Sequence, residues 1–357
     1  MLDINPTGKK MILSVDGGGM RGTIAIAMLA ELEQMTSRPA FELFDMFAGT
    51  STGAIIAAGL AIGLSAEKML ETVYKDRLPK AFPPRNVAFW VRYLLGGLRH
   101  LYDIEPFANA LVPLVSGIKV GDIQRKIVFM TAKDMRSGDT LYVVNKGPGR
   151  VLAADWPLSG AVAASGAAPI FFPPVAGNLV DGGVGVYSNP SLAAATEAME
   201  YIGADEGFVE DGVMLVSLGT GYVPNVVADG APRRFWLAQW VVYVILESLD
   251  DTALQQVFVT RAIYGSRLDF RRYNPLLTRD NVTGVLGLPL EGGVDPMLLG
   301  LDSYAPAEVA LMEKIGRAYA RLIDWTKPNA MPWTTPGGHP KPDTLKFPVT
   351  WTGTPFA

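Results

Sequence analysis

The chain has 357 residues, 49% of them hydrophobic and 18% charged, with a formal net charge of −4 at pH 7. This length and composition suit a large α/β domain with an ample apolar core. The acidic balance argues against a nucleic-acid partner, because proteins that bind nucleic acids usually carry a basic excess. Cysteine is absent, which excludes disulfides and thiol chemistry, and the only histidines are His100 and His339.

The first ten residues are polar and lack the apolar core of a signal peptide. No apolar run reaches the roughly 18 residues that a membrane-spanning helix needs. The nearest run, 235–246, is too short and contains Gln239. We therefore expect a cytoplasmic protein without a transmembrane segment that can associate peripherally with a membrane. Nothing in the sequence indicates a homo-oligomer, a metal site or an organic cofactor.

Apolar runs and turns alternate along the first part of the chain in a way that predicts an α/β fold. A predicted strand at 11–15 precedes a predicted helix at 24–35, and 43–48 and 54–62 repeat that order. Such repetition is typical of a parallel sheet with crossover helices. Further strands are expected at 126–131, 141–144 and 213–218, and further helices at 155–168, 190–201 and 305–325.

The end of the chain differs in composition from the rest. Beyond Lys327 it is rich in Pro, Gly and Thr, which excludes a regular helix or a central strand. We therefore divide the chain into one catalytic domain, 1–326, and a C-terminal arm, 327–357. The arm contains Trp333 and Trp351. These large aromatic side chains favour packing against another part of the protein rather than a disordered tail.

A glycine-rich turn, Asp16 to Gly22, follows the first predicted strand and opens the first helix. Gly17-x-Gly19-x-x-Gly22 matches the dinucleotide-binding pattern, but the acidic residue expected after the next strand is missing. A Walker loop fails because no lysine follows Gly22. Glycine N–H groups at a helix start bind anions, and in acyl transfer that anion is the tetrahedral oxyanion.

The second predicted strand ends in Gly49-Thr50-Ser51-Thr52-Gly53. This G-x-S-x-G pattern places a serine on a sharp strand-to-helix turn, where small neighbours let a substrate approach Oγ. The apolar runs on both sides supply that context. Ser51 is therefore the candidate nucleophile, with Gly49 and Gly53 in support, although the two glycines could also serve tight packing alone.

A serine nucleophile needs a base, and the two histidines are poorly placed to act as one. Ser51, Asp181 and His339 follow the chain order of α/β-hydrolases. However, His339 lies in the Pro/Gly-rich arm, and Ser51 comes too early in the chain for that fold. His100 lies in an aromatic and basic stretch, where a solvated or packing role is more natural. Asp181 remains, although an isolated Asp-Gly-Gly is usually only a turn.

These motifs, in this order, resemble the patatin-like phospholipases. The similarity covers 16–22, 49–53, 163–174, 181–183, 189–190 and 217–221, and continues more weakly over 240–269. The resemblance implies a three-layer α/β/α sandwich with a mainly parallel central sheet. It also implies lipid acyl hydrolysis by a Ser–Asp dyad without histidine, metal or organic cofactor.

By residue match, the resemblance makes Ser51 the nucleophile and Asp181 the base. The Gly17-Gly18-Gly19 turn would hold the oxyanion through Gly18 and Gly19, with Arg21 in support and Gly182 completing the later motif. The residues alone leave three alternatives. They are a carboxylesterase for short soluble esters with the same dyad, a nucleotide-binding module, and an inactive lipid-binding protein.

Two stretches combine aromatic with basic side chains, one around Trp90 (89–102) and one containing Trp236 and Trp240 (233–243). This composition is typical of a helix that lies in a membrane interface. The stretches therefore predict a lipid substrate met at a membrane or micelle surface. Ordinary core packing is the alternative explanation for each.

Overall fold

The computed structural model describes residues 2–82, 91, 100–224 and 231–327. The stretch around Trp90 therefore lies outside the described residues except for Val91 and 100–102. The predicted C-terminal arm lies outside them except for Lys327, so the proposed boundary at 326/327 stays a prediction.

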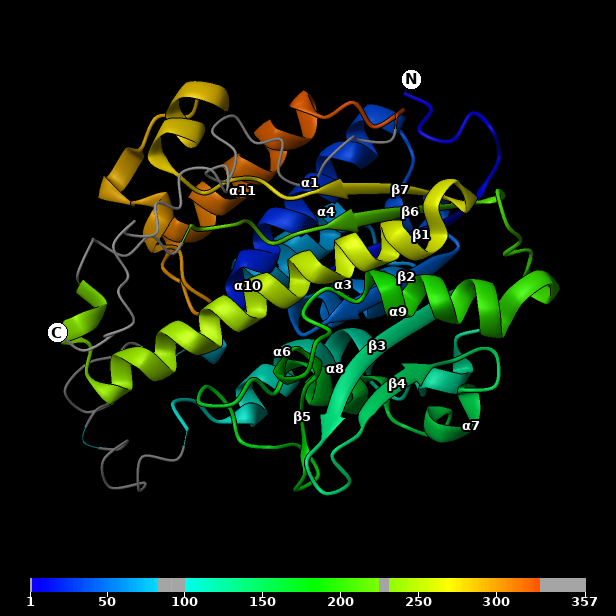
Figure 1. Ribbon diagram of the computed structural model, residues 1–357, viewed down its shortest axis with the longest axis horizontal. Helices are drawn as coiled ribbons and strands as arrows, with labels where there is room; N and C mark the ends of the chain where they lie inside the picture. The colour runs from blue at the N-terminus through cyan, green and yellow to red at the C-terminus, as the bar shows by residue number, and fades with distance from the viewer. Residues whose placement is uncertain (1, 83–90, 92–99, 225–230, 328–357) are drawn as a thin grey trace, which may run out of the picture.

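Seven strands form one sheet in the order β4-β3-β2-β1-β6-β7, with β5 paired to β3 (Figure 1). Neighbours are parallel from β3 through β2, β1 and β6 to β7, whereas β4 and β5 run antiparallel to β3. The strands are β1 (Lys10–Val15), β2 (Met46–Thr50), β3 (Ile127–Asp134), β4 (Thr140–Val144), β5 (Leu179–Asp181), β6 (Val213–Leu218) and β7 (Leu268–Tyr273).

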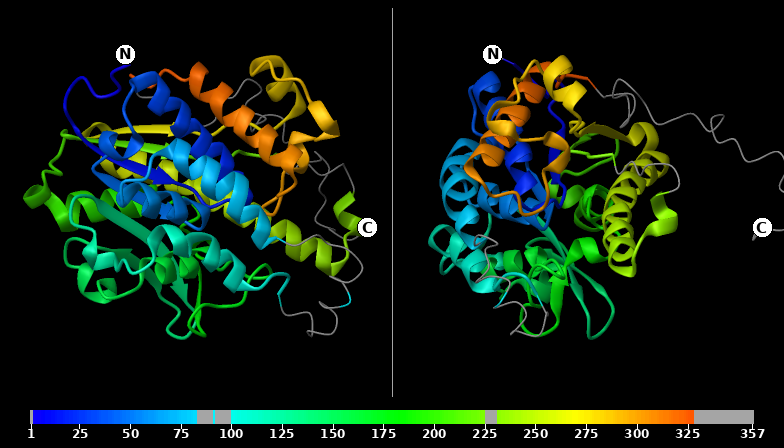
Figure 2. Two further views of the ribbon diagram at one scale, coloured as in Figure 1. Left: turned by 180° about the vertical axis from the view of Figure 1, so that it is seen from behind. Right: turned by 90° about the vertical axis from the view of Figure 1, so that its left-hand side faces the viewer.

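Helices cover both faces of this sheet. One face packs on α1, α3, α4, α6, α8 and α11, and the other on α9 and α10. The right-hand view of Figure 2 shows α10 on one side of the strands and α1 and α11 on the other. The helices are α1 (Gly22–Thr36), α2 (Ala40–Leu43), α3 (Thr52–Ala61), α4 (Ala66–Met69), α6 (Ile104–Val115), α7 (Arg150–Ala153), α8 (Leu158–Gly166), α9 (Ser191–Thr196), α10 (Leu237–Tyr264) and α11 (Pro306–Leu322).

The sheet is buried on both sides because successive strand residues face opposite layers. Ile12 packs with α9 and α10, whereas its neighbour Leu13 packs with α1 and α3. The three-layer α/β/α sandwich with a mainly parallel sheet, expected from the sequence, is thereby confirmed.

Most predicted elements differ from the structure by a few residues at their ends, and three of them show a local reason. In the run 43–48, Leu43 ends α2 and the strand begins only at Met46, because the Asp45 carboxylate accepts the Met11 N–H at 2.9 Å before pairing starts. The helix expected at 155–168 is shorter, since Pro157 precedes its first turn. The helix expected at 190–201 changes from α to a π-helical turn at Glu197.

One side of β3 is shared by two strands, and this sharing brings distant residues together. β2 pairs with β3 as far as Thr50 opposite Thr131. Next along β3, Ala132 pairs with Asp181 of β5. Because β4 occupies the other side of β3 at these positions, β5 must continue the side that β2 leaves. The residue after Thr50 and the last residue of β5 therefore meet.

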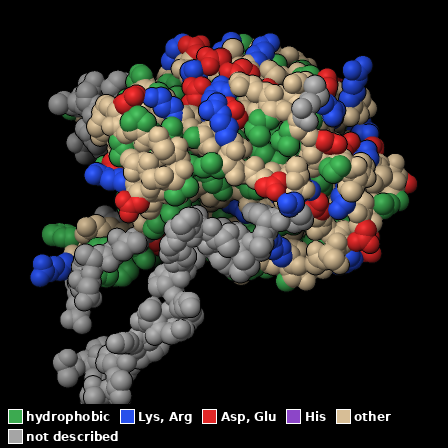
Figure 3. All heavy atoms as spheres, turned by 90° about the horizontal axis from the view of Figure 1, so that it is seen from above, with side chains coloured by type: hydrophobic (Ala, Val, Ile, Leu, Met, Phe, Trp, Pro, Cys, Tyr) green, Lys and Arg blue, Asp and Glu red, His purple; other side chains and the backbone are tan. Residues whose placement is uncertain are grey.

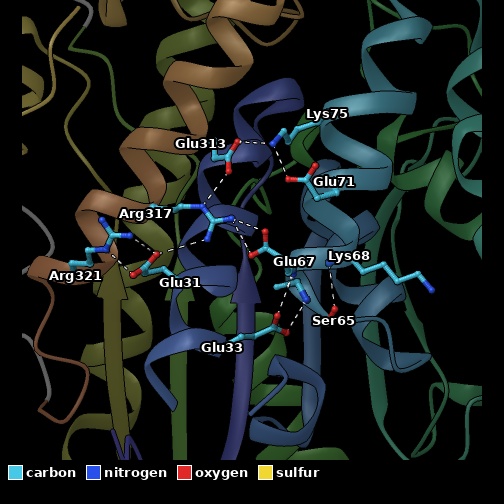
Figure 4. A network of polar contacts seen from close by, with 11 residues as sticks. Glu31, Glu33, Ser65, Glu67, Lys68, Glu71, Lys75, Glu313, Arg317 and Arg321 are labelled. Carbon is cyan, nitrogen blue, oxygen red and sulfur yellow. Dashed lines mark hydrogen bonds and ion pairs between the residues drawn. The ribbon is translucent and has the colours of Figure 1, made fainter. Parts of the chain in front are cut away.

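Helix α11 is attached to α1 and α4 by a network of ion pairs (Figure 4). Arg317 donates to both Glu67 carboxylate oxygens at 2.8 and 2.9 Å and to Glu313 at 3.1 Å. Arg321 donates two further hydrogen bonds, of 2.6 and 3.0 Å, to the Glu31 carboxylate. The Arg317 side chain is only 17% exposed and that of Glu31 only 7%, so this network is screened less than a surface pair.

We predict that Arg317→Met lowers the free energy of unfolding by about 2 kcal/mol, because it removes the cation shared by three carboxylates, two of which are largely buried. Urea denaturation measures the loss. Lys68→Met is the control, since Lys68 is exposed and its side chain points away from the network (Figure 4). It should change stability by less than about 0.5 kcal/mol. Equal effects of the two substitutions would contradict the role given to the network.

Candidate active site

A cavity of about 770 Å³ opens at the carboxyl ends of the parallel strands. Its lining includes the turns that follow β1, β2 and β6, together with the last residues of β7. This edge of an open α/β sheet is where ligands usually bind, because the loops there converge from several strands. Ser51, Asp181, Gly17, Gly18, Gly19 and Arg21, which the sequence singled out, all line this cavity.

Ser51 sits on a strained turn between β2 and α3. Its φ of 57° and ψ of −121° lie outside the regions that non-glycine residues favour. The turn is held by the Ser51 N–H, which donates to Ser165 Oγ at 2.9 Å. Neither flanking glycine has room for a side chain. A Cβ added at Gly49 would lie 2.0 Å from the Gly53 carbonyl oxygen, and a Cβ added at Gly53 would lie 2.1 Å from the Val15 carbonyl oxygen.

Asp181 is 5% exposed and lies beside Ser51. Burial raises its pKa to about 6, while hydrogen bonds from the Ser51 side chain and the Gly183 N–H oppose this rise. The Gly183 bond measures 2.8 Å. Gly182 is required for close packing, because an added Cβ would lie 2.2 Å from Thr131 Oγ1. A carboxylate of this pKa, bonded to a serine hydroxyl, is ionised at neutral pH and can accept the hydroxyl proton.

Two N–H groups of the glycine turn, in residues that line the cavity, have no hydrogen-bond partner within the described residues. The Gly17 N–H is already used, since it donates to the Ser188 carbonyl at 2.8 Å, and the Met20 N–H donates to the Leu301 carbonyl at 2.7 Å. The N–H groups of Gly18 and Gly19 donate no hydrogen bond within the described residues. Of the three glycines singled out from the sequence, these two can therefore serve an oxyanion.

Neither of these two positions has room for a side chain. An added Cβ at Gly18 would lie 2.0 Å from Thr220 Oγ1, and one at Gly19 would lie 2.1 Å from the Leu301 carbonyl oxygen. Gly19 also has a φ of 56°, in the left-handed region that favours glycine. The Thr220 hydroxyl donates to the Gly17 carbonyl at 2.8 Å, so the loop after β6 holds the glycine turn in place.

Two arginines lie behind this turn, and they differ in their partners. Arg272 donates to both Asp16 carboxylate oxygens, at 2.8 and 2.5 Å, and to Ser217 Oγ at 2.9 Å. Arg21 makes no hydrogen bond or ion pair within the described part of the chain, and its Nε is buried. Burial lowers the pKa of Arg21, which the charges of Asp250 and Asp16 partly offset.

The one histidine in the described part of the chain, His100, takes no part in the site. His100 lies 3.8 Å from Asp103 through Nε2 and does not line the cavity. His339 lies outside the described residues. Among the residues that are described, no cluster of His, Asp and Glu side chains has the arrangement of a metal site.

The sequence did not single out several residues that hold Ser51 and Asp181 in place. Thr50 donates to the Tyr187 carbonyl at 2.6 Å and pairs with Thr131 Oγ1 at 2.7 Å, which ties the end of β2 to the loop after Asp181. Ser165 lies within the segment 163–174 that carries part of the resemblance. The sequence therefore marked this segment but gave no role to Ser165. Leu301 had no local signal, because its backbone carbonyl makes the contact.

A family model described as patatin-like phospholipase matches residues 13–195, about half of the chain. The chain belongs to the patatin-like phospholipase family. This membership confirms the resemblance drawn from the motifs, and the family's enzyme class, lipid acyl hydrolase, is the one expected from the sequence. The match includes Ser51 and Asp181 but ends before β6, α10 and α11.

Relatives of this patatin-like chain include an intracellular phospholipase A2 of Caenorhabditis elegans, 31% identical over 64% of this chain and 21% of the worm protein. A cGAMP-activated phospholipase of Escherichia coli (strain TW11681) is 29% identical over 62% of this chain and 65% of its own. The chain thus spans less than two thirds of either relative. Human GIVD cytosolic phospholipase A2 aligns in structure at 13% identity with a TM-score of 0.37, over 89% of this chain and 59% of its own.

We predict that Asp181→Asn stabilises the protein at alkaline pH. The folded pKa of about 6 exceeds the ordinary value of 3.8, so the stability contributed by the protonated form is lost as pH rises through 6. An uncharged amide avoids that loss. The free energy of unfolding at pH 8 should therefore rise by up to about 3 kcal/mol.

Urea denaturation at pH 8 and pH 5 measures this effect, and the gain should shrink at pH 5, where wild-type Asp181 is mostly protonated. Asp205→Asn is the control, because Asp205 is exposed and has no ion-pair partner within the described residues. A lower stability of Asp181→Asn at pH 8 would show that the ionised carboxylate is favoured by the fold.

Proposed function

We propose that this protein hydrolyses acyl esters of phospholipids or related lipids, with Ser51 as nucleophile and Asp181 as base. The observation that carries the proposal is the hydrogen bond between the Ser51 side chain and a buried carboxylate of raised pKa, inside a largely apolar cavity. Family membership supports the lipid substrate.

One wall of the cavity suits an acyl chain. It is lined by apolar side chains from α3, α6 and the segments at 78–82 and 168–172, and the ring centroids of Phe82 and Phe107 lie 5.9 and 5.2 Å from that of Phe172. Burying an alkyl chain against such a wall contributes roughly 25 cal/mol per Å² of apolar surface. A substrate with a long acyl chain therefore fits this cavity better than a short soluble ester.

In the first half of the reaction, Ser51 Oγ attacks the ester carbonyl and its proton passes to Asp181. The carbonyl oxygen becomes an oxyanion that accepts hydrogen bonds from the Gly18 and Gly19 N–H groups. Such preorganised donors are worth about 3–4 kcal/mol each in a measured protease. Collapse of the tetrahedral intermediate breaks the ester bond, and the alcohol leaves with the proton from Asp181.

In the second half, a water molecule attacks the acyl-Ser51 ester while Asp181 accepts its proton. The same N–H groups hold the second oxyanion, and the fatty acid leaves as Ser51 recovers its hydroxyl proton. The two halves of the reaction together consume one water molecule and require no oxidant, metal or other co-reactant. Arg21 lines the same cavity, and its positive charge favours the anionic intermediate.

We propose further that the start of α10 meets the lipid surface. Trp236, Leu237 and Trp240 are 79%, 81% and 41% exposed, and the exposed Arg234 precedes them. This end of α10 extends past the sheet on the side where the parallel strands end (Figure 1), and hydrophobic side chains gather with a basic group at the projection on the left of Figure 3. Exposed apolar patches of this kind mark interaction sites.

None of the helices in the described residues is both long and apolar enough to cross a bilayer. The aromatic rings of Phe235, Trp240 and Tyr243 contact one another at the start of α10, with centroids 5.3 to 6.3 Å apart. Trp236 lies outside this cluster and points its indole into solvent, since most of its surface is exposed. Aromatic and basic side chains together suit the headgroup layer of a membrane.

We expect Ser51→Ala to abolish hydrolysis of a long-chain phospholipid and to abolish covalent labelling by a fluorophosphonate. Mass spectrometry of the labelled wild-type protein should find the adduct on Ser51. Wild-type activity should fall as pH drops through about 6, because protonated Asp181 cannot accept the serine proton. His100→Ala is the control and should retain activity. Labelling of another residue, or loss of activity in His100→Ala with the fold retained, would contradict the dyad.

We expect Trp236→Ala combined with Trp240→Ala to weaken binding to phospholipid vesicles about tenfold, because the exposed indoles lose apolar surface that the headgroup layer would bury. Vesicle sedimentation measures the change. Tyr201→Ala is a matched control, since Tyr201 is 60% exposed and lies away from the cavity lining. Unchanged vesicle binding in the double variant would show that another surface meets the lipid.

A further inference from the structure

The cavity has a second wall, which is formed by α10 and carries three carboxylates among apolar side chains. Glu247, Asp250 and Asp251 line the cavity from this helix. They lie three and four positions apart, which places them on one helix face. The apolar wall and α10 pack on opposite faces of the sheet. An acyl chain and a polar group could therefore lie on different sides of the cavity.

These three carboxylates have no partner within the described residues, in contrast to the other acids of the cavity. Asp16 is held by Arg272, and Asp302 accepts the Tyr102 hydroxyl at 2.7 Å. Like charges at this spacing destabilise a helix, and the neighbouring Glu247 and Asp251 add to the effect of burial in raising the pKa of Asp250 to about 6. The helix itself therefore gains nothing from this arrangement.

Arg21 is the second, independent feature of this end of the cavity. Its Nε is buried without a hydrogen-bond partner, and the side chain makes no ion pair within the described part of the chain. Asp250 is near enough for each charge to shift the pKa of the other. Even so, the two do not form an ion pair. The Arg21 guanidinium and the three α10 carboxylates therefore line the same cavity without a salt-bridge partner within the described residues.

We propose that Glu247, Asp250 and Asp251 bind the ammonium group of a zwitterionic phospholipid head group, while Arg21 faces its phosphate. This inference rests on the proposed function, because it takes the acyl chain to lie on the apolar wall with its ester at Ser51. A zwitterion matches the site in both signs of charge. An anionic head group without an ammonium meets the same carboxylates with repulsion, and it is disfavoured.

The test compares two lipids with identical oleoyl chains, phosphatidylcholine and phosphatidylglycerol, in neutral detergent micelles at pH 8. The full chain is used, and kcat/KM is measured for each lipid. The wild-type protein should favour phosphatidylcholine. The double variant Glu247→Gln, Asp251→Asn should lower this preference about fivefold, the scale of partly exposed ion pairs. It keeps Asp250, and so leaves the surroundings of Arg21 intact.

Two further variants complete the experiment. Asp250→Asn should lower the preference for phosphatidylcholine in the same direction. Glu200→Gln is the matched control, because Glu200 is an exposed acid outside the cavity lining, and it should leave the preference unchanged. Circular dichroism confirms that each variant is folded.

Equal hydrolysis of both lipids by the wild-type protein would overturn the inference, as would a preference that persists in both α10 variants. Either result leaves the proposed function standing, provided that hydrolysis is lost in Ser51→Ala. If neither lipid is hydrolysed in a Ser51-dependent way, the proposed function itself fails. The acidic face of α10 would then serve only to offset the charge of Arg21.

Discussion

The candidate active site depends on the way one strand is paired. β3 is paired with β2 as far as Thr131 and with β5 from Ala132 onward, on the same side. Backbone hydrogen bonds of the sheet thus set the end of one strand against the end of another. Ser51 follows β2 and Asp181 ends β5, so their approach is built into the sheet and does not rest on flexible loops. Sites carried on such rigid elements hold their geometry well.

The loop after Asp181 extends this arrangement to the glycine turn. It accepts the Thr50 hydroxyl at Tyr187 and the Gly17 N–H at Ser188. On the far side, the Leu301 carbonyl accepts the Met20 N–H. The Leu301 carbonyl leaves no room for a side chain at Gly19, and the Thr220 side chain leaves none at Gly18, which explains why glycine occupies both positions. The backbone hydrogen bonds also use the N–H groups on either side of Gly18 and Gly19, whereas those of Gly18 and Gly19 have no hydrogen-bond partner within the described residues.

Two buried carboxylates of this site differ in role because their partners differ. Asp16 is held by the guanidinium of Arg272, and the pair braces the base of the glycine turn. Burial raises the pKa of both carboxylates, but Asp181 has only neutral donors, the Ser51 side chain and the Gly183 N–H, and its pKa rises to about 6. Environment separates an aspartate that braces structure from one suited to proton transfer. In the proposed mechanism, that same burial is a cost to stability that serves catalysis.

The sequence by itself determined the fold class, the strand–turn–helix order and the family. These follow from local properties: alternating apolar runs, and glycines at the positions where an added Cβ would collide. It also singled out Ser51, Asp181, Gly18 and Gly19, because their short motifs occur together in the order that resembles the family, although Asp-Gly-Gly alone is a weak signal. Element boundaries were less certain, since contacts such as that of Asp45 with Met11 end or delay an element from far along the chain.

Only the tertiary structure decided which of these residues meet. The pairing of Ala132 with Asp181, the contact of Leu301 with the glycine turn and the approach of α10 to Arg21 join segments far apart in sequence. Such contacts depend on strand order and on the path of the chain between the elements, which local patterns do not encode. The backbone carbonyls that hold the turn carry no residue-specific signal at all. For that physical reason the sequence could name the candidate site residues, whereas the geometry that unites them had to come from the fold.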